Sequence, residues 1–133
     1  MGSNGLNERG AAVALASTPL YQLKAEFFRT LGHPVRIRVL ELLSEREYAV
    51  GEMLAMVEVE APNLSQHLAV LRRAGLVRTR KDGPTVFYSL TSPHAADLLV
   101  AARKFLTGIL SGQAELLEEM LAPEDGPDTA LQA

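Results

Sequence analysis

The side chains best suited to chemistry lie in one short segment, Ala61 to Gly75, with the sequence APNLSQHLAVLRRAG. A helix turns by about 100° per residue, which gathers the leucines of this segment into one narrow stripe. That stripe consists of Leu64, Leu68 and Leu71. The opposite side holds Pro62, Gln66, Ala69 and Arg73. We therefore predict a helix with one face that packs and one face that is free to bind a partner.

The free face carries groups that suit double-stranded DNA. Asn63, Ser65 and Gln66 lie in the first turns, where amides and hydroxyls could meet base edges. Arg72 and Arg73 lie in the last turn, where guanidinium groups could contact phosphates. An ordinary amphipathic surface helix would show the same pattern, so the flanking segments have to decide between the two interpretations.

A β-hairpin is predicted directly after this helix. Gly75 fits a helix C-cap, and the segments Leu76–Lys81 and Thr85–Leu90 are rich in β-forming residues on either side of a turn at Asp82-Gly83-Pro84. Its first arm and tip carry Arg78, Arg80 and Lys81. A hairpin charged only for solubility and edge protection is the alternative. Its place after a helix pair favours a wing that lies along the DNA backbone or in the minor groove.

The segments before the candidate recognition helix complete a helix-turn-helix. Thr18 is predicted to cap a helix that starts at Pro19 and ends near Leu31, and His33-Pro34 opens a second helix in which His33 is a cap or turn residue. An extended piece near Arg46–Ala49 leads into a helix at about Val50–Val57, followed by a four-residue turn. The fold class is thus mainly α with a small β-hairpin wing, a winged helix-turn-helix.

The last helix is predicted to run from Ser92-Pro93 to about Leu121, with weakening at Gly108 and Gly112. Its length, roughly 40–45 Å at 1.5 Å per residue, exceeds what a domain of this size can cover. Its apolar side chains, and the two apolar sides of the first helix, therefore need a second surface. A symmetric copy of the chain is the simplest partner.

Composition and charge narrow the function classes. The 133 residues fit one domain at 18–122, with flexible tails predicted at 1–17 and, acidic, at 123–133. No apolar run is long enough for a membrane span, so a cytoplasmic protein is expected. The net charge is −3, yet residues 62–90 carry five basic and one acidic side chain. Because phosphate attraction depends on local potential, a local DNA footprint is compatible with the acidic total.

The chain resembles the ArsR/SmtB family of bacterial winged-helix repressors. The resemblance covers roughly residues 19–121, and its specific part is the string S-x-H-L-x-x-L-x-x-A-G-L-V together with L-x-x-P-x-R upstream. The segments that carry it are LGHPVRIRVLELL (Leu31–Leu43), VGEM (Val50–Met53), NLSQHLAVLRRAGLV (Asn63–Val77) and VFYSL (Val86–Leu90).

The resemblance implies a homodimer held by the first and last helices, which binds an inverted repeat and represses a promoter until an effector releases it. By motif position, the segment that meets DNA holds Ser65, Gln66 and His67, and the wing holds Arg78, Arg80 and Lys81. Arg36 matches an arginine near the DNA backbone. For His67, which lies beside the apolar stripe, packing or a hydrogen bond to the scaffold is an equal alternative to a base contact.

The effector site departs from the family pattern. There is no cysteine, so thiolate sites for arsenic, cadmium and lead are excluded. Where zinc, cobalt and nickel sensors of the family carry four ligands, this chain keeps only His94; the matching downstream positions are Phe105 and Gly108. His94 and Asp97 could form half of a different site for nickel, zinc or cobalt. A second chain would complete it with Glu115, Glu118 or Glu119.

Three alternatives stay open at this stage. Asp97 could simply interact with the positive N-terminal end of the last helix through the helix dipole, in which case no metal binds there. The effector could be organic, or there could be none. The winged helix could also dock a protein instead of DNA, although Gln66 and Arg73 on the free face argue against this. Glu58 and Glu60 would face phosphates and weaken the affinity, unless they are turned away or paired. No catalytic triad or phosphate loop indicates an enzyme.

Overall fold

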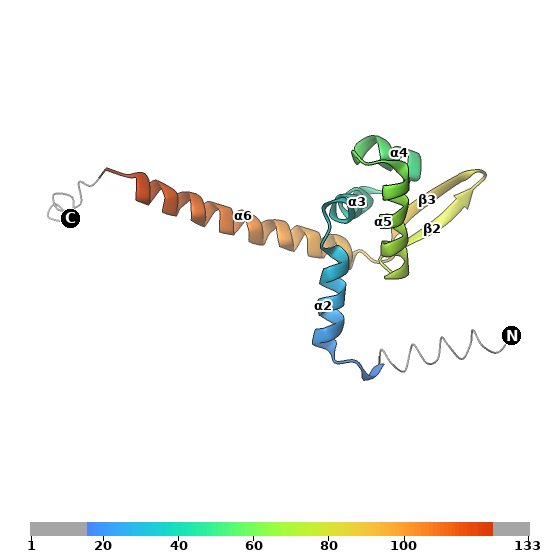
Figure 1. Cartoon of the computed structure of the whole chain (residues 1–133), viewed down its shortest axis with the longest axis horizontal. Coiled ribbons are helices and arrows are strands. Elements are labelled where there is room, and N and C mark those ends of the chain that lie inside the picture. Colours follow the sequence, from blue (N-terminus) through green and yellow to red (C-terminus); the bar gives the residue numbers. More distant parts are fainter. Residues whose placement is uncertain (1–15, 124–133) are drawn as a thin grey trace. The chain divides into compact units, whose positions relative to one another are not determined.

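The computed structural model describes residues 16–123 (Figure 1). It divides into two compact units, one that ends at Ala96 and one that begins at Asp97, and each is described by itself. Apart from residues 16, 17 and 123, the predicted tails lie outside the described part. The elements are α2 (Leu20–Leu31), α3 (Pro34–Glu45), β1 (Tyr48–Ala49), α4 (Val50–Met56), α5 (Ala61–Arg73), β2 (Val77–Asp82), β3 (Thr85–Leu90) and α6 (His94–Leu121).

The predicted order of helices and hairpin is confirmed, with a correction at the start of α2. Pro19, and not Thr18, is the N-cap residue of this helix, and Pro19 makes no side-chain capping hydrogen bond. The Pro19 carbonyl accepts hydrogen bonds from the amides of Gln22 and Leu23 at 3.0 and 3.3 Å. The physical reason is that proline, which has no amide hydrogen and a fixed φ, fits the position just before a helix as well as the first helical position. Here its φ of −57° and ψ of 142° place Pro19 just before the helix.

The next helix begins as the sequence predicted. His33 is the N-cap of α3, and its Nδ1 atom accepts a hydrogen bond from the Val35 amide at 3.1 Å. Pro34 follows at the first helical position, where its missing N–H has no partner to lose. α3 packs against α5.

The core of the first unit lies between α3, α4 and α5. The leucine stripe of α5 is buried as predicted, and it packs against α3, which contributes more buried apolar residues than any other element of the described chain. The largest fully buried side chains are Val39, Leu40, Leu42, Met53, Leu64, Leu68 and Leu71. Since the stripe occupies one side of α5, the opposite side of this helix stays exposed.

Gly75 ends α5 and starts the hairpin. Its φ of +78° lies in the left-handed region, and its amide donates to the Arg72 carbonyl at 3.0 Å. The Leu76 amide donates to the Leu71 carbonyl at 3.0 Å, which completes a Schellman motif. The Thr91 hydroxyl then donates to the Gly75 carbonyl at 2.7 Å. These bonds fix the base of the hairpin to the end of α5.

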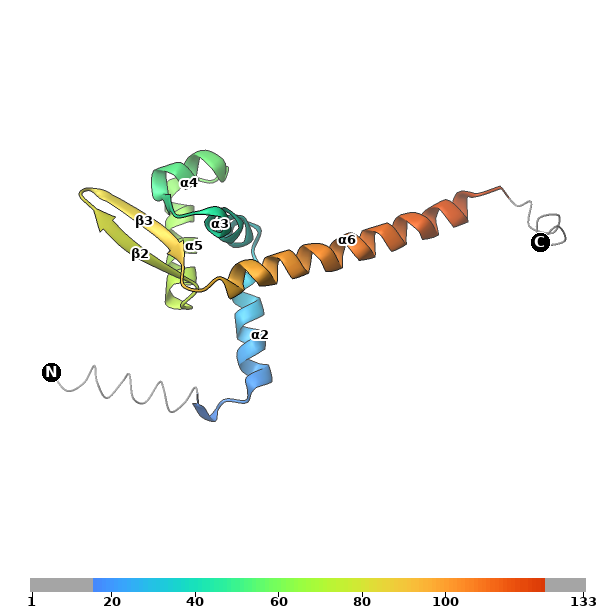
Figure 2. The same ribbon diagram turned by 180° about the vertical axis from the view of Figure 1, so that it is seen from behind.

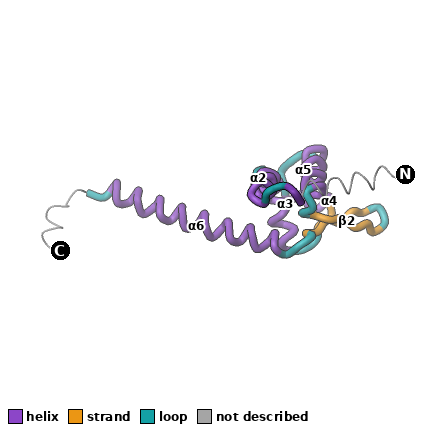
Figure 3. Tube along the Cα trace, turned by 90° about the horizontal axis from the view of Figure 1, so that it is seen from below, coloured by secondary structure: helices purple, strands orange, loops and turns teal. Residues whose placement is uncertain are grey.

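The hairpin belongs to a three-stranded antiparallel sheet with the order β1-β3-β2. Arg80 lies opposite Phe87, and Asp82 opposite Thr85, so the loop consists of Gly83 and Pro84. Gly83 has a φ of +59°, which with a proline after it fits a type II′ turn. Figures 2 and 3 show the hairpin extending beyond the helices of this unit.

The second unit is the long part of α6. The Ser92 hydroxyl accepts a hydrogen bond from the His94 amide at 3.2 Å, which confirms the predicted cap. The helix is continuous through Gly108 and Gly112 and ends at Leu121, as the predicted run requires. No residue of α6 is buried, and exposed apolar side chains follow its length, among them Phe105, Leu106, Leu110, Leu117 and Met120. Between residues 16 and 123, no helix has the length and apolar composition needed to cross a bilayer.

Replacing Gly75 by alanine tests the junction between α5 and the hairpin. No atom lies within 4 Å of an added Cβ, so the penalty is purely that of the left-handed backbone. We expect Gly75→Ala to lower the free energy of unfolding by about 1–2 kcal/mol. Gly51→Ala is the matched control: it also meets nothing within 4 Å, but it lies inside α4, where alanine should stabilise. Equal effects in urea titrations would contradict this account of Gly75.

Candidate nucleic-acid interface

The outer face of α5 presents the predicted base-reading groups to solvent. Asn63, Ser65 and Gln66 are all exposed, whereas Leu64 and Leu68, their neighbours in the same turns, are almost fully buried. No hydrogen bond within the described residues uses the side chains of Asn63, Ser65 or Gln66. Their amides and hydroxyl are therefore available to an external partner.

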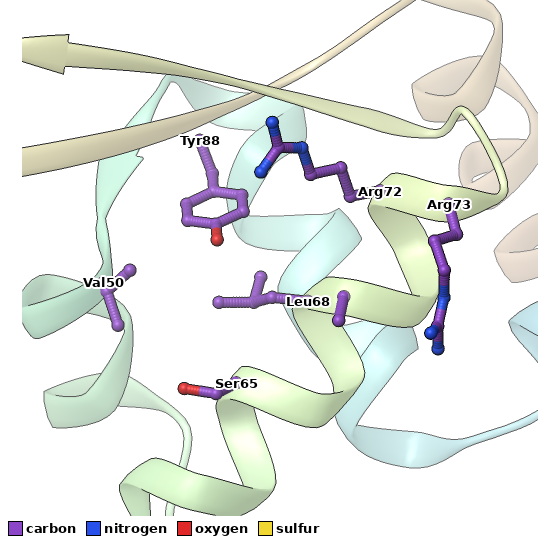
Figure 4. A pocket seen from close by; sticks show the side chains of 7 residues that line it. Val50, Ser65, Leu68, Arg72, Arg73 and Tyr88 are labelled. Atoms are coloured by element: carbon purple, nitrogen blue, oxygen red, sulfur yellow. The ribbon is translucent and has the colours of Figure 1, made fainter. Parts of the chain in front are cut away.

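The arginines at the end of α5 point in different directions. Arg72 lies on the side of the hairpin, near Tyr88 of β3, whereas the Arg73 side chain extends in another direction (Figure 4); both arginines line the hollow between α5 and the sheet. Both side chains are exposed, and neither forms an ion pair within residues 16–123. Between α5 and the sheet there is an open hollow of about 520 Å³, whose lining includes Val50, Ser65 and Tyr88.

His67 is bonded to the scaffold. Its Nδ1 atom accepts a hydrogen bond from Arg36 Nε at 3.1 Å, and Arg36 NH1 donates to the Thr30 carbonyl at 3.0 Å. The His67 ring also lies against the ring of His33, with the centroids 4.1 Å apart. Arg36 thus joins the end of α2 to α5, and two of its donors are used inside the protein. Of the two roles considered for His67 from the sequence, the hydrogen bond to the scaffold is the one that the structure contains.

The surroundings of His67 favour its neutral form. Burial, the nearby His33 and the Arg36 guanidinium together hold the pKa of His67 below its usual value. Each of them disfavours a positive charge on the ring. A neutral ring also suits the hydrogen bond from Arg36, because Nδ1 can accept only when it carries no proton.

The three cations of the hairpin differ in their surroundings. Arg80 is paired with Glu47: its Nε lies 3.1 and 3.2 Å from the two carboxylate oxygens, and its guanidinium carbon lies 4.4 Å from the centre of the Phe87 ring. The hydrogen bond to Arg80 lowers the pKa of Glu47. Lys81 and Arg78 form no ion pair within the described residues, although Arg78 donates to the Ser89 hydroxyl at 3.3 Å.

Sequence reasoning missed Glu47, which neutralises one predicted wing cation and fastens the hairpin to the segment before β1. The two residues are 33 positions apart. Only the pairing of β1 with β3 brings them together, and a two-residue strand leaves no readable alternation in the sequence. Arg46 is held in the same region, by Glu52 at 2.9 Å and by the Tyr48 ring at 3.7 Å.

The candidate metal ligands form no cluster in a single chain. Among residues 16–123, no three His, Asp or Glu side chains come together as a metal site. His94 and Asp97 belong to the first turn of α6, whereas Glu115, Glu118 and Glu119 lie near its other end. A helix of this length keeps the two groups far apart within one chain. Any site that uses both therefore needs a second chain.

Comparison with known proteins identifies the family. Residues 33–79 match the model of the bacterial regulatory proteins of the arsR family. The chain is 54% identical over 109 residues to the uncharacterized HTH-type transcriptional regulator Rv0081 of Mycobacterium tuberculosis, which covers 81% of this chain and 96% of that protein. The chain belongs to the ArsR family. It is therefore a transcriptional regulator with a winged helix-turn-helix and not an enzyme, as the sequence predicted.

Other relatives and a solved structure agree with this assignment. HTH-type transcriptional regulator KmtR of Mycobacterium tuberculosis is 48% identical over 80 residues, which are 60% of this chain and 62% of KmtR. The biofilm growth-associated repressor of Xylella fastidiosa is 43% identical over 77 residues, 58% of this chain and 68% of that protein. The crystal structure of Rv0081 superposes with a TM-score of 0.69 at 56% identity, covering 74% of this chain and 99% of that one.

The lowered pKa of His67 predicts a pH-dependent stability. Because the unfolded chain binds a proton more readily, the stability contributed by neutral His67 is complete above about pH 6.5 and is lost as the pH falls through the lowered folded pKa. His67→Asn keeps an acceptor close to the position of Nδ1 but cannot be protonated. We expect the melting temperature of the wild type to fall more steeply than that of His67→Asn between pH 7.5 and 5. If the melting temperatures of the two proteins fall in parallel with pH, His67 is not the group responsible for the pH dependence.

Proposed function

We propose that this ArsR-family protein is a homodimeric repressor that binds an inverted-repeat operator in the cytoplasm. The observation that carries the proposal is the division of α5 into a buried leucine stripe and an exposed face with Gln66 and Arg73. Unpaired cations of the wing, Arg78 and Lys81, follow it in the same unit. Repression is supported by the relative from Xylella fastidiosa, which is named a repressor.

In this proposal α5 enters the major groove with its first turns toward the bases. Gln66 is suited to adenine, because its amide offers one donor and one acceptor that match N7 and the N6 amino group. Asn63 and Ser65 lie near it on the exposed side and fix the register of the helix. Protein docking would favour an apolar outer face, and the exposed groups of α5 are polar.

The remaining predicted residues divide into phosphate contacts and positioning residues. Arg72, Arg73, Arg78 and Lys81 are exposed and unpaired, and we assign them to the DNA backbone. Arg80 also belongs to the DNA-contacting surface of the wing, although the ion pair with Glu47 partly offsets its charge. Arg36 and His67 hold α5 in place through their mutual hydrogen bond, and we assign them an indirect role.

The dimer is proposed from the apolar faces of α2 and α6. Leu20, Tyr21 and Phe28 of α2 are between 56% and 72% exposed in the single chain, and α6 has no buried residue at all. Such surfaces are costly in water and indicate an interface. A twofold dimer would place two α5 helices one helical turn of DNA apart, which requires an inverted repeat.

The proposal also includes an effector that releases the protein from DNA. A divalent nickel, zinc or cobalt ion would bind His94 and Asp97 of one chain together with Glu115, Glu118 or Glu119 of the other, since each chain supplies only part of a ligand set. Oxygen and imidazole ligands suit these ions. Anisotropy titrations of a promoter duplex with each metal decide between this site and an organic effector or none.

Removal of the Gln66 amide tests base recognition. We expect Gln66→Ala to weaken binding to the operator by about 1–3 kcal/mol and to change binding to random duplex very little. The measurement is fluorescence anisotropy on both duplexes at one salt concentration. An equal loss on both duplexes would show that Gln66 does not distinguish bases.

The tip of the wing has a separate electrostatic test. Each phosphate contact contributes about 0.9 to the slope of log affinity against log salt. Because the proposed dimer carries two wings, Lys81→Gln should flatten the slope by about two units. Lys104→Gln makes the same change of charge on α6 and should leave the slope unchanged. If both variants behave like the wild type, the wing tip does not contact phosphate.

A further inference from the structure

The hollow between α5 and the sheet contains polar groups that the protein itself does not use. Its lining includes Ser65 and Arg72 of α5, Tyr88 of β3 and Val50 of α4, and its volume is about 520 Å³. Figure 4 shows the Arg72 guanidinium and the Tyr88 ring on the same side of α5. All four residues belong to the first unit.

Three of these side chains keep hydrogen-bonding groups that the protein does not use. Within residues 16–123, the Ser65 hydroxyl, the Tyr88 hydroxyl and the Arg72 guanidinium make no hydrogen bond or ion pair with another part of the protein. Tyr88 is half-buried, and its hydroxyl stays accessible from solvent, since no buried side-chain oxygen or nitrogen of the described residues lacks a partner. All three groups are therefore available to one external partner. That partner must accept hydrogen bonds, since a guanidinium can only donate and both hydroxyls can donate.

The geometry of duplex DNA supplies such a partner at this place. Adjacent major and minor grooves are separated by a single sugar-phosphate strand. If α5 lies in the major groove and the wing lies in the next minor groove, this strand has to pass between the two elements. The hollow is the space between them. This step rests on the proposed function, because it takes both contacts with DNA as given.

We propose that the hollow binds one backbone phosphate of the operator. Arg72 donates charge-assisted hydrogen bonds to the non-bridging oxygens, and the hydroxyls of Tyr88 and Ser65 donate to the same group. Val50 and Leu68 exclude water from one side, which strengthens these bonds. Because the donors come from α5 and from β3, one phosphate connects the recognition helix to the wing. Tyr88 thereby becomes a DNA-contact residue, which the sequence did not indicate.

The test replaces single phosphates of the duplex by neutral methylphosphonate linkages. In the full chain, one linkage in each half-site should weaken binding by about tenfold or more when it is neutralised, as expected for a charge-assisted contact. In Arg72→Gln, the same linkage should lose its effect, while other linkages keep theirs. Tyr88→Phe should weaken binding to the natural duplex about three- to tenfold and have little effect on the duplex with the neutral linkage.

Arg103→Gln is the matched control, because it makes the same substitution and removes the same charge on α6, outside the lining of the hollow. It should leave the effect of that particular linkage intact. Tyr88→Phe keeps the aromatic ring, and circular dichroism verifies that each variant folds. The proposal is overturned if Arg72→Gln and the wild type show the same methylphosphonate profile, or if Tyr88→Phe binds like the wild type. Failure of the wild type to bind any duplex would overturn the proposed function as well.

Discussion

The burial of Leu64, Leu68 and Leu71 against α3 is the constraint on which the interface depends. Each buried leucine contributes about 1.5–3 kcal/mol, so a rotation of α5 about its axis would be strongly unfavourable. This packing fixes which side of the helix faces outward. The hydrogen bond between Arg36 and His67 adds a second, polar restraint on the same helix. The polar groups proposed to contact DNA can therefore stay exposed without any contact that holds them individually.

The position of the wing is set by the way in which α5 ends. The left-handed Gly75 turns the chain within the Schellman motif, and Thr91 closes the base of the hairpin against it. Glu47 fastens the other side through Arg80, which lowers the local positive charge. The wing thus has fewer unpaired cations than its sequence suggests. An acidic chain with a small unpaired basic region is suited to local and salt-sensitive binding.

Local patterns could be predicted from the sequence, whereas contacts between distant segments could not. The leucine period predicted α5, the turn residues predicted the hairpin, and the cap at His33 was evident from the proline after it. The bonds from Arg36 to His67 and from Arg80 to Glu47 join residues 31 and 33 positions apart, and no local pattern signals them. The helix cap predicted at Thr18 was wrong, because the sequence pattern of a helix start fits Thr18 and Pro19 equally well. The unpaired hydroxyl of Tyr88 became visible only when β3 and α5 were placed together.

The most direct test of the central claim is an amide chemical-shift titration of the full chain with a duplex from its own promoter at low ionic strength. The account predicts that the largest shifts occur in α5, from Asn63 to Arg73, and in the hairpin from Val77 to Leu90. Shifts that are absent, or that are largest in α4 and spare the exposed face of α5, would contradict it.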